Sequence, residues 1–156
     1  MDDLHLRQLT KELVAEKLRS LPDPCATTAE LVRKTLLLAL KDADLATQER
    51  LAQETCQGAI TALLLAQQNL SRGAVKLLEQ VADVANDLQL EPAVLMIGAM
   101  RGIADLRRFV PPEELFELRK ALEARFIGVG EVFATILLQQ EKANPTPPSS
   151  TANPKT

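Results

Sequence analysis

Residues 45–70 read LATQERLAQETCQGAITALLLAQQNL, and one stripe of small and apolar residues runs along them. The stripe recurs at spacings of 4, 3, 4, 3 and 4 residues: Ala52, Cys56, Ala59, Leu63, Ala66 and Leu70. This spacing matches the 3.6-residue repeat of an α-helix. The stretch therefore predicts a long amphipathic helix from about Leu45 to Asn69.

The composition favours helices throughout the 156 residues. Alanine, leucine, glutamate, glutamine, lysine and arginine dominate, whereas the chain has only 4 Phe and neither Tyr nor Trp. The first group contains good helix formers, and strands prefer aromatic and β-branched side chains. Because no segment alternates between apolar and polar residues as a strand does, we expect an all-α protein.

Helix-breaking residues divide the chain into seven expected helices. Thr27 and Glu30 have the spacing of a capping box. Proline suits the first turn of a helix, so Pro92 and Pro112 are expected to begin two others. The expected helices cover residues 3–21, 27–41, 45–69, 71–90, 92–110, 112–126 and 131–142. They predict a compact multi-helix bundle or a helical-hairpin array of six or seven helices, forming a single domain over residues 1–143.

The last residues differ in composition from the rest of the chain. Residues 144–156 contain four prolines together with Ser, Thr and Asn, and they lack a large apolar side chain. A segment of this kind cannot bury enough surface to fold. We therefore expect a disordered C-terminal tail.

An internal similarity at an offset of 40 residues suggests a repeat. Residues 58–63 (GAITAL) and 98–103 (GAMRGI) share the pattern Gly-Ala-apolar-x-small-apolar. Two similar helical hairpins, over about 52–90 and 92–130, would produce this match. Short matches also arise by chance in helical proteins, so the repeat is one of two open interpretations.

Small residues at helical spacing form the candidate helix-packing or interaction face: Gly58, Ala62, Ala66, Gly98 and Gly102. A glycine inside a helix costs about 1 kcal/mol relative to alanine, and close packing of another helix can offset that cost. We therefore expect Gly58 and Gly102 to lie at tight helix crossings. The crossings belong either to the bundle itself or to a face through which two copies associate.

An acidic row is a candidate site for a cation or a basic partner. Glu79, Asp83 and Asp87 lie four residues apart on one helix face, where like charges repel. A calcium ion needs six or more oxygen ligands, which one row of carboxylates does not supply. A solvated surface is therefore the simpler interpretation.

A basic pair is the candidate contact for an anion. Arg101 and Arg108 share one helix face, and arginine binds phosphate or carboxylate groups through two hydrogen bonds. Pairing of Arg101 with Asp105, four residues further on, explains the same pattern without a ligand. Four glutamates interrupt the basic residues of the next helix, so we do not expect nucleic-acid binding.

Residues suited to catalysis or metal binding are scarce. The chain has one histidine, His5, and two cysteines, Cys25 and Cys56. These are too few for a structural zinc site or a disulfide framework, and a terminal histidine is poorly supported for catalysis. Cys56 lies on the apolar stripe and is expected to be buried, whereas Cys25 lies in a proline-rich loop and is expected to be exposed. We therefore expect no enzyme activity, cofactor or metal.

Net charge and hydropathy indicate where in the cell the protein acts. The net charge is −3, from 18 basic and 21 acidic residues, which gives no general attraction to polyanions. The longest apolar run, residues 93–100, is far shorter than the roughly 20 residues of a membrane span. The N-terminus is acidic where a secretory signal is basic. We expect a cytoplasmic protein without membrane contacts, and the abundance of alanine and leucine favours a bacterial origin.

These patterns favour a non-enzymatic helical protein-interaction module, such as an adaptor, assembly factor or regulator, that associates with itself or with a protein partner. The leucine runs at residues 36–38 and 63–65 support this hypothesis, because three leucines in succession cover more than one helix face and call for burial on several sides. The alternative is a bundle that binds a small anionic or apolar ligand between its helices, with Arg101 and Arg108 as the anion contacts.

Overall fold

The structure is a computed structural model that describes Glu12 and residues 21–143. This part of the chain is mainly helical. Six α-helices and one short 3-10 helix follow in order: α2 (Pro24–Ala39), α3 (Leu45–Leu65), α4 (Leu70–Leu88), α5 (Pro92–Ala104), η1 (Asp105–Arg108), α6 (Pro112–Arg125) and α7 (Val129–Ala143). These residues include no strand, so the all-α prediction is confirmed. The helix expected over residues 3–21 and the tail expected over residues 144–156 lie outside the described residues, except for Glu12 and Leu21.

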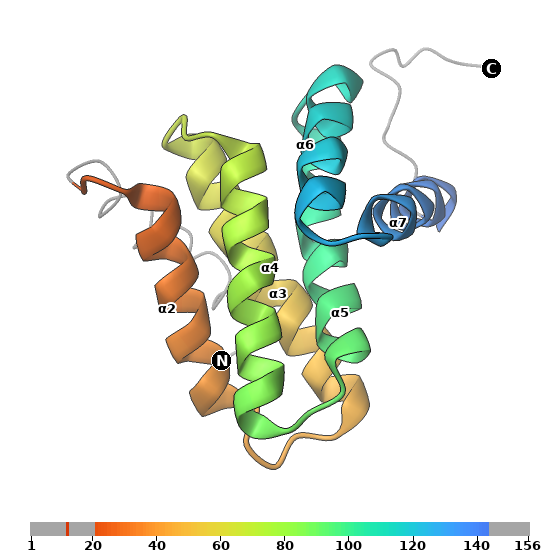
Figure 1. The fold of residues 1–156 in the computed structure, drawn as a ribbon. Coiled ribbons are helices and arrows are strands. Elements are labelled where there is room, and N and C mark those ends of the chain that lie inside the picture. Colours follow the sequence, from red (N-terminus) through yellow and green to blue (C-terminus); the bar gives the residue numbers. More distant parts are fainter. Residues whose placement is uncertain (1–11, 13–20, 144–156) are drawn as a thin grey trace.

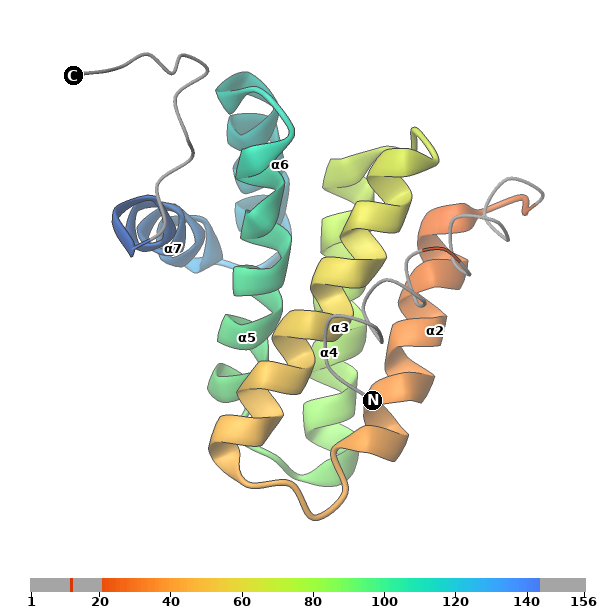
Figure 2. The same cartoon turned by 180° about the vertical axis from the view of Figure 1, so that it is seen from behind.

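The helices α2 to α5 run in alternating directions and form the body of the molecule (Figure 1). Helix α3 packs most extensively on α5, and α2 packs on α4. Helix α6 contacts α4 and α7. Helix α7 runs across the others, so that it is seen nearly end-on while the remaining helices stand upright (Figures 1 and 2).

Most helix starts follow from local capping. The side chain of Asp44 accepts a hydrogen bond of 2.8 Å from the amide of Thr47, as expected for the cap of α3. Pro92 and Pro112 begin α5 and α6, as predicted. The capping box predicted at Thr27 is wrong, because α2 begins one turn earlier, where Asp23 accepts from the amide of Ala26 and a proline occupies the first helical position.

A glutamine in the left-handed backbone conformation follows the last turn of both α3 and α4. Gln67 has φ 58° and Gln89 has φ 56°. Beside the first of these, the amide of Gln68 donates 2.9 Å to the carbonyl oxygen of Leu63, which satisfies an unpaired acceptor at the end of α3. Helix α3 therefore ends at Leu65, four residues before the predicted boundary.

The core consists mainly of aliphatic side chains from the described helices, together with Phe133 of α7. The predicted stripe on α3 is buried at Ala52, Cys56, Ala59 and Leu63. The leucine runs are buried only in part. Leu36 and Leu63 are buried, whereas Leu38 is 76% exposed and Leu65 is 54% exposed. The expectation of burial on several sides is therefore wrong for the third leucine of each run, because each lies on the outer face of its helix.

The proposed 40-residue repeat stays a prediction. Helix α3 has 21 residues, whereas α5 has 13 and continues into η1. Each described helix is too short or too polar to cross a lipid bilayer.

Candidate functional site

The two glycines of α5 lie where this helix touches the backbone of α3. A β-carbon placed on Gly98 would overlap the carbonyl oxygen of Glu49, and one on Gly102 would overlap the carbonyl oxygen of Gln53. Both glycines are buried, so only the absence of a side chain allows this close crossing. Their nearest neighbours on α3 are Glu49, Ala52, Gln53 and Gln57.

The remaining small residues lie on α3. Gly58 and Ala62 are buried, and Ala66 is a half-buried residue at the C-terminal cap of this helix. A single face formed by all five small residues stays a prediction. Gly98 and Gly102 are enclosed by their own chain, which leaves no room there for a second copy.

The two candidate anion contacts are engaged by carboxylates. Arg101 forms an ion pair with Glu49 of α3, which holds α5 against that helix. Arg108 lies 3.4 Å from Oδ1 of Asp105, and the other oxygen of this carboxylate accepts 3.0 Å from the side-chain amide of Gln57. The pairing of Arg101 with Asp105 suggested by their spacing is therefore wrong. The two arginines do not converge on one ligand.

The acidic row of α4 is divided between two neighbouring helices. Glu79 accepts a hydrogen bond of 2.7 Å from Nε of Arg125 in α6, and Asp87 accepts one of 2.6 Å from Arg33 in α2. Asp83, between them, is exposed. Within the described residues, no group of three or more histidine, cysteine, aspartate or glutamate side chains is arranged to hold a metal ion. The row therefore serves helix packing at both ends.

The two cysteines are buried thiols. Cys56 lies in the core of α3, and burial raises the pKa of its thiol to about 12. The prediction that Cys25 is exposed is wrong, because it lies in the first turn of α2 and packs against α4 near Gly73. Burial raises the pKa of the Cys25 thiol, and its Sγ donates to the carbonyl oxygen of Asn69 at 3.5 Å. Neither thiol is suited to act as a nucleophile.

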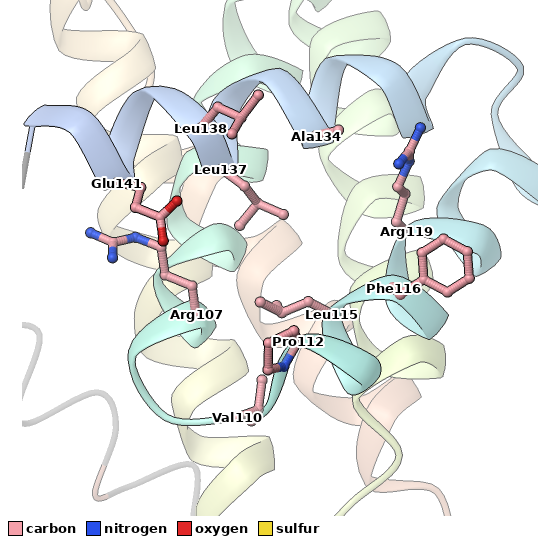
Figure 3. A pocket seen from close by; sticks show the side chains of 10 residues that line it. All are labelled: Arg107, Val110, Pro112, Leu115, Phe116, Arg119, Ala134, Leu137, Leu138 and Glu141. Atoms are coloured by element: carbon pink, nitrogen blue, oxygen red, sulfur yellow. The ribbon is translucent and has the colours of Figure 1, made fainter. Parts of the chain in front are cut away.

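An open apolar groove between α6 and α7, here called the α6–α7 groove, is the most promising site (Figure 3). It encloses about 430 Å³. Its lining is mainly aliphatic and aromatic, with two arginines and one glutamate: Arg107, Val110, Pro112, Leu115, Phe116, Arg119, Ala134, Leu137, Leu138 and Glu141. A concave apolar surface of this size is where proteins bind ligands and partner segments.

The side chains of α6 form one wall of the groove. Leu118 and Leu122 of this helix are buried in the core, and Phe116 lies on the outer side with 53% of its surface exposed. The ammonium of Lys120 lies 5.2 Å from the centre of the Phe116 ring. Arg119 lies beside Phe116 in the close view (Figure 3). This wall therefore offers an aromatic ring with the ammonium of Lys120 over it and Arg119 beside it.

Helix α7 forms the other wall, and buried residues and hydrogen bonds fix its direction. Phe133 and Ile136 are buried against the bundle, whereas Leu138 is 59% exposed over the groove. Arg107 donates 3.2 Å to the carbonyl oxygen of Gln140, and the side-chain amide of Gln140 donates 3.0 Å to the carbonyl oxygen of Arg101. These contacts anchor the last turns of α7 on α5 and η1, which sets the width of the groove.

The sequence alone does not reveal this groove. Leu115, Leu118, Leu122 and Phe126 form an apolar stripe at helical spacing on α6, and Phe116 lies beside that stripe. Leu138 lies on α7 next to Leu137 and carries no signal of exposure in the sequence. An exposed aromatic residue one position away from a complete apolar stripe is the only hint that the sequence contains.

Comparison with known proteins gives no relative: no family model, no curated protein and no solved structure matches the chain. The functional interpretation therefore depends on the geometry of the chain itself.

Proposed function

We propose that this chain is a non-enzymatic helical protein-interaction module that binds a partner through the α6–α7 groove. The observation that carries the proposal is the concentration of exposed apolar side chains in this part of the chain. Among the described residues, nine large apolar side chains are exposed, and five of them lie between residues 109 and 138: Phe109, Phe116, Ile127, Val132 and Leu138. Two of these five, Phe116 and Leu138, line the groove itself. Exposed apolar residues gathered in one region are typical of interaction surfaces.

The shape of the groove favours a protein segment over a small molecule. Small-molecule sites usually bury most of the ligand surface, whereas this groove lies open between the sides of two helices (Figure 3). An amphipathic helix laid into such a groove buries its apolar face and leaves its polar face in water. Phe116 and Leu138 would be the anchors of this contact, because large side chains in the centre of an interface supply most of the binding energy.

The rest of the molecule supports a scaffold role. Arg101 and Arg108 are held by carboxylates of the chain, and the acidic residues Glu79 and Asp87 hold neighbouring helices. The polar clusters are thus used to fix the bundle. A cytoplasmic site of action belongs to the proposal, since both cysteines are free thiols.

A small amphiphilic carboxylate is the second candidate occupant of the groove. The volume of about 430 Å³ falls within the range of small-molecule sites, and the Arg119 guanidinium at its edge could bind a carboxylate. Native mass spectrometry of the purified protein separates this candidate from a protein partner. A retained small molecule, lost from the Leu138→Glu variant, would favour the ligand.

Photo-crosslinking in the producing cells tests the proposal. A photo-reactive phenylalanine analogue replaces Phe116 in one variant and Leu38 in a control, because Leu38 is more exposed but lies on α2, away from the groove. We expect discrete protein adducts from position 116 and none from position 38. A second substitution, Leu138→Glu, is expected to remove those adducts. Equal adduct patterns at both positions would contradict the proposal.

A further inference from the structure

The α6–α7 groove carries opposite charges at its two ends, and among the described residues neither has an ion-pair partner. Arg119 lies at the first turn of α7, since its Cγ is 3.5 Å from the β-carbon position of Gly130. Glu141 lies in the last turn of the same helix. The rise of 1.5 Å per residue places Gly130 and Glu141 about 16 Å apart along α7. Figure 3 shows the two side chains at opposite ends of the apolar floor.

Neither Arg119 nor Glu141 forms an ion pair with another residue in the part of the chain that the structure describes. The charge of Arg119 contributes to the lowered pKa of Glu123, but the carboxylate of Glu123 accepts its hydrogen bonds from the amides of Gly128 and Gly130. Arg107, at the Glu141 end, donates to the carbonyl oxygen of Gln140. Arg119 and Glu141 thus remain available to a partner.

Both charges also oppose the dipole of α7. The N-terminal end of a helix carries partial positive charge and the C-terminal end carries partial negative charge. The cation Arg119 lies at the positive end, and the anion Glu141 lies at the negative end. Each charge would therefore be stabilised by an opposite charge brought in from outside the chain.

We infer that the occupant of the α6–α7 groove is the same groove of a second copy of this chain. A two-fold axis perpendicular to α7 places the two α7 helices antiparallel. Arg119 of one copy then faces Glu141 of the other, twice, while Leu138 and Phe116 of both copies cover one another. Isologous two-fold dimers are the commonest oligomers of soluble proteins, and the antiparallel arrangement also opposes the two helix dipoles favourably.

The C-terminal tail is a poor competitor for this site. Residues 144–156 follow directly after α7 but contain no large apolar side chain. A groove lined by leucine and phenylalanine needs apolar anchors from its occupant. A second copy supplies them in its own Leu138 and Phe116.

Sedimentation equilibrium of charge-reversed variants tests the inference, which rests on the proposed function of the groove. For the unmodified protein we expect both monomer and dimer to be populated at protein concentrations between about 1 μM and about 1 mM. Arg119→Glu alone and Glu141→Arg alone are each expected to weaken the dimer by about tenfold or more, because each places like charges opposite each other twice. The control Lys34→Glu, an exposed reversal on α2, should leave the equilibrium unchanged.

The decisive sample is the mixture of the two single variants. In a heterodimer of the two variants, the new glutamate at position 119 of one chain faces the new arginine at position 141 of the other, and the native Glu141 and Arg119 face each other at the other end. The mixture is therefore expected to form heterodimers with the affinity of the unmodified dimer. A chain carrying both substitutions should dimerise with itself again. Leu138→Glu should weaken the dimer by about 100-fold. Helical circular dichroism of each variant verifies that it is folded.

Two results would overturn the inference. One is a monomer over the whole concentration range, and the other is a dimer whose affinity does not follow the charge pattern. A monomer that still gives photo-adducts with another protein at position 116 would refute the second copy alone. Loss of those adducts as well would refute the proposed function.

Discussion

The backbone amide of Gly130, in the first turn of α7, donates a hydrogen bond of 2.8 Å to Oε1 of Glu123 in α6. The amide of Gly128 donates to the same carboxylate, at 2.9 Å from Oε2. The first amides of a helix lack acceptors within that helix, so Glu123 caps α7 from another helix. This cap joins the two walls of the α6–α7 groove.

Removal of this cap is expected to loosen α7 before the rest of the bundle. In Glu123→Ala the amides of Gly128 and Gly130 lose their acceptor, so their hydrogen exchange should accelerate and the urea midpoint should fall. Glu117→Ala is the matched control, because Glu117 lies on α6 and pairs only locally with Lys120. Equal exchange at Gly130 in both variants would show that the carboxylate does not hold α7.

The same cap predicts a pH dependence with a definite sign. The hydrogen bond from Gly128, followed by that from Gly130, lowers the pKa of Glu123 below its ordinary value of 4.5. A lowered pKa in the folded state means that the ionised group adds stability above pH 4.5, and that this stability is lost as the pH falls through the folded pKa. Asp23 and Asp44 also have lowered pKa values, so the measurement is the difference between the unmodified protein and Glu123→Ala. We expect that difference to shrink below pH 4.5, and a constant difference down to pH 2 would contradict the cap.

Any side chain at the two glycines of α5 should destabilise the fold. Alanine is the better helix former by about 1 kcal/mol, but its β-carbon would overlap the backbone of α3 at Gly98 and Gly102. We expect Gly98→Ala and Gly102→Ala to lower the free energy of unfolding by roughly 1–3 kcal/mol. Ala93→Leu, at an exposed position of the same helix, should change it by less than about 0.5 kcal/mol. Denaturant unfolding measures all three, and stabilisation by either alanine would refute the close crossing.

The ion pair of Arg101 with Glu49 is expected to be structural. A double-mutant cycle with Arg101→Ala and Glu49→Ala should give a coupling of about 0.2–1 kcal/mol, because both side chains are partly exposed. Inorganic phosphate should not raise the melting temperature beyond the effect of ionic strength. A specific rise that disappears in Arg101→Ala would instead restore the anion site suggested by the sequence.

The native thiols should resist modification in the folded protein. Cys56 is fully buried with a pKa of about 12, and Cys25 is buried in α2, so the reactive thiolate is scarce at neutral pH. We expect both to react with a thiol reagent at least about 100-fold more slowly in buffer than in denaturant. Rapid reaction of Cys25 in buffer would show that the first turn of α2 opens readily.

Much of the fold could be predicted from local chemistry. Asp44, Pro92 and Pro112 mark helix starts that the structure contains, because caps and prolines act over a few residues. The left-handed turns at Gln67 and Gln89 could not be predicted, since glycine and asparagine favour that conformation at helix ends and glutamine does not. The close crossing was indicated by Gly102, but its partner on α3 was not.

The groove could not be predicted, because it depends on the direction of α7. That direction is fixed by contacts between residues far apart in the sequence, such as Arg107 with Gln140 and Gln140 with Arg101. No spacing within one helix encodes such a contact. The exposure of Leu138 follows from this direction and not from its own neighbours.

Site-specific labelling tests the groove as a contact site most directly. Because the native thiols are buried, Leu138→Cys and Leu38→Cys each introduce one reactive cysteine, the first in the groove and the second on α2. The maleimide labelling rate at each position is measured in intact producing cells and in dilute purified protein. The first rate divided by the second gives a labelling ratio for each position. We expect this ratio to be several-fold lower at position 138 than at position 38, because a bound partner covers the groove. Equal ratios at the two positions would contradict an interaction through the α6–α7 groove.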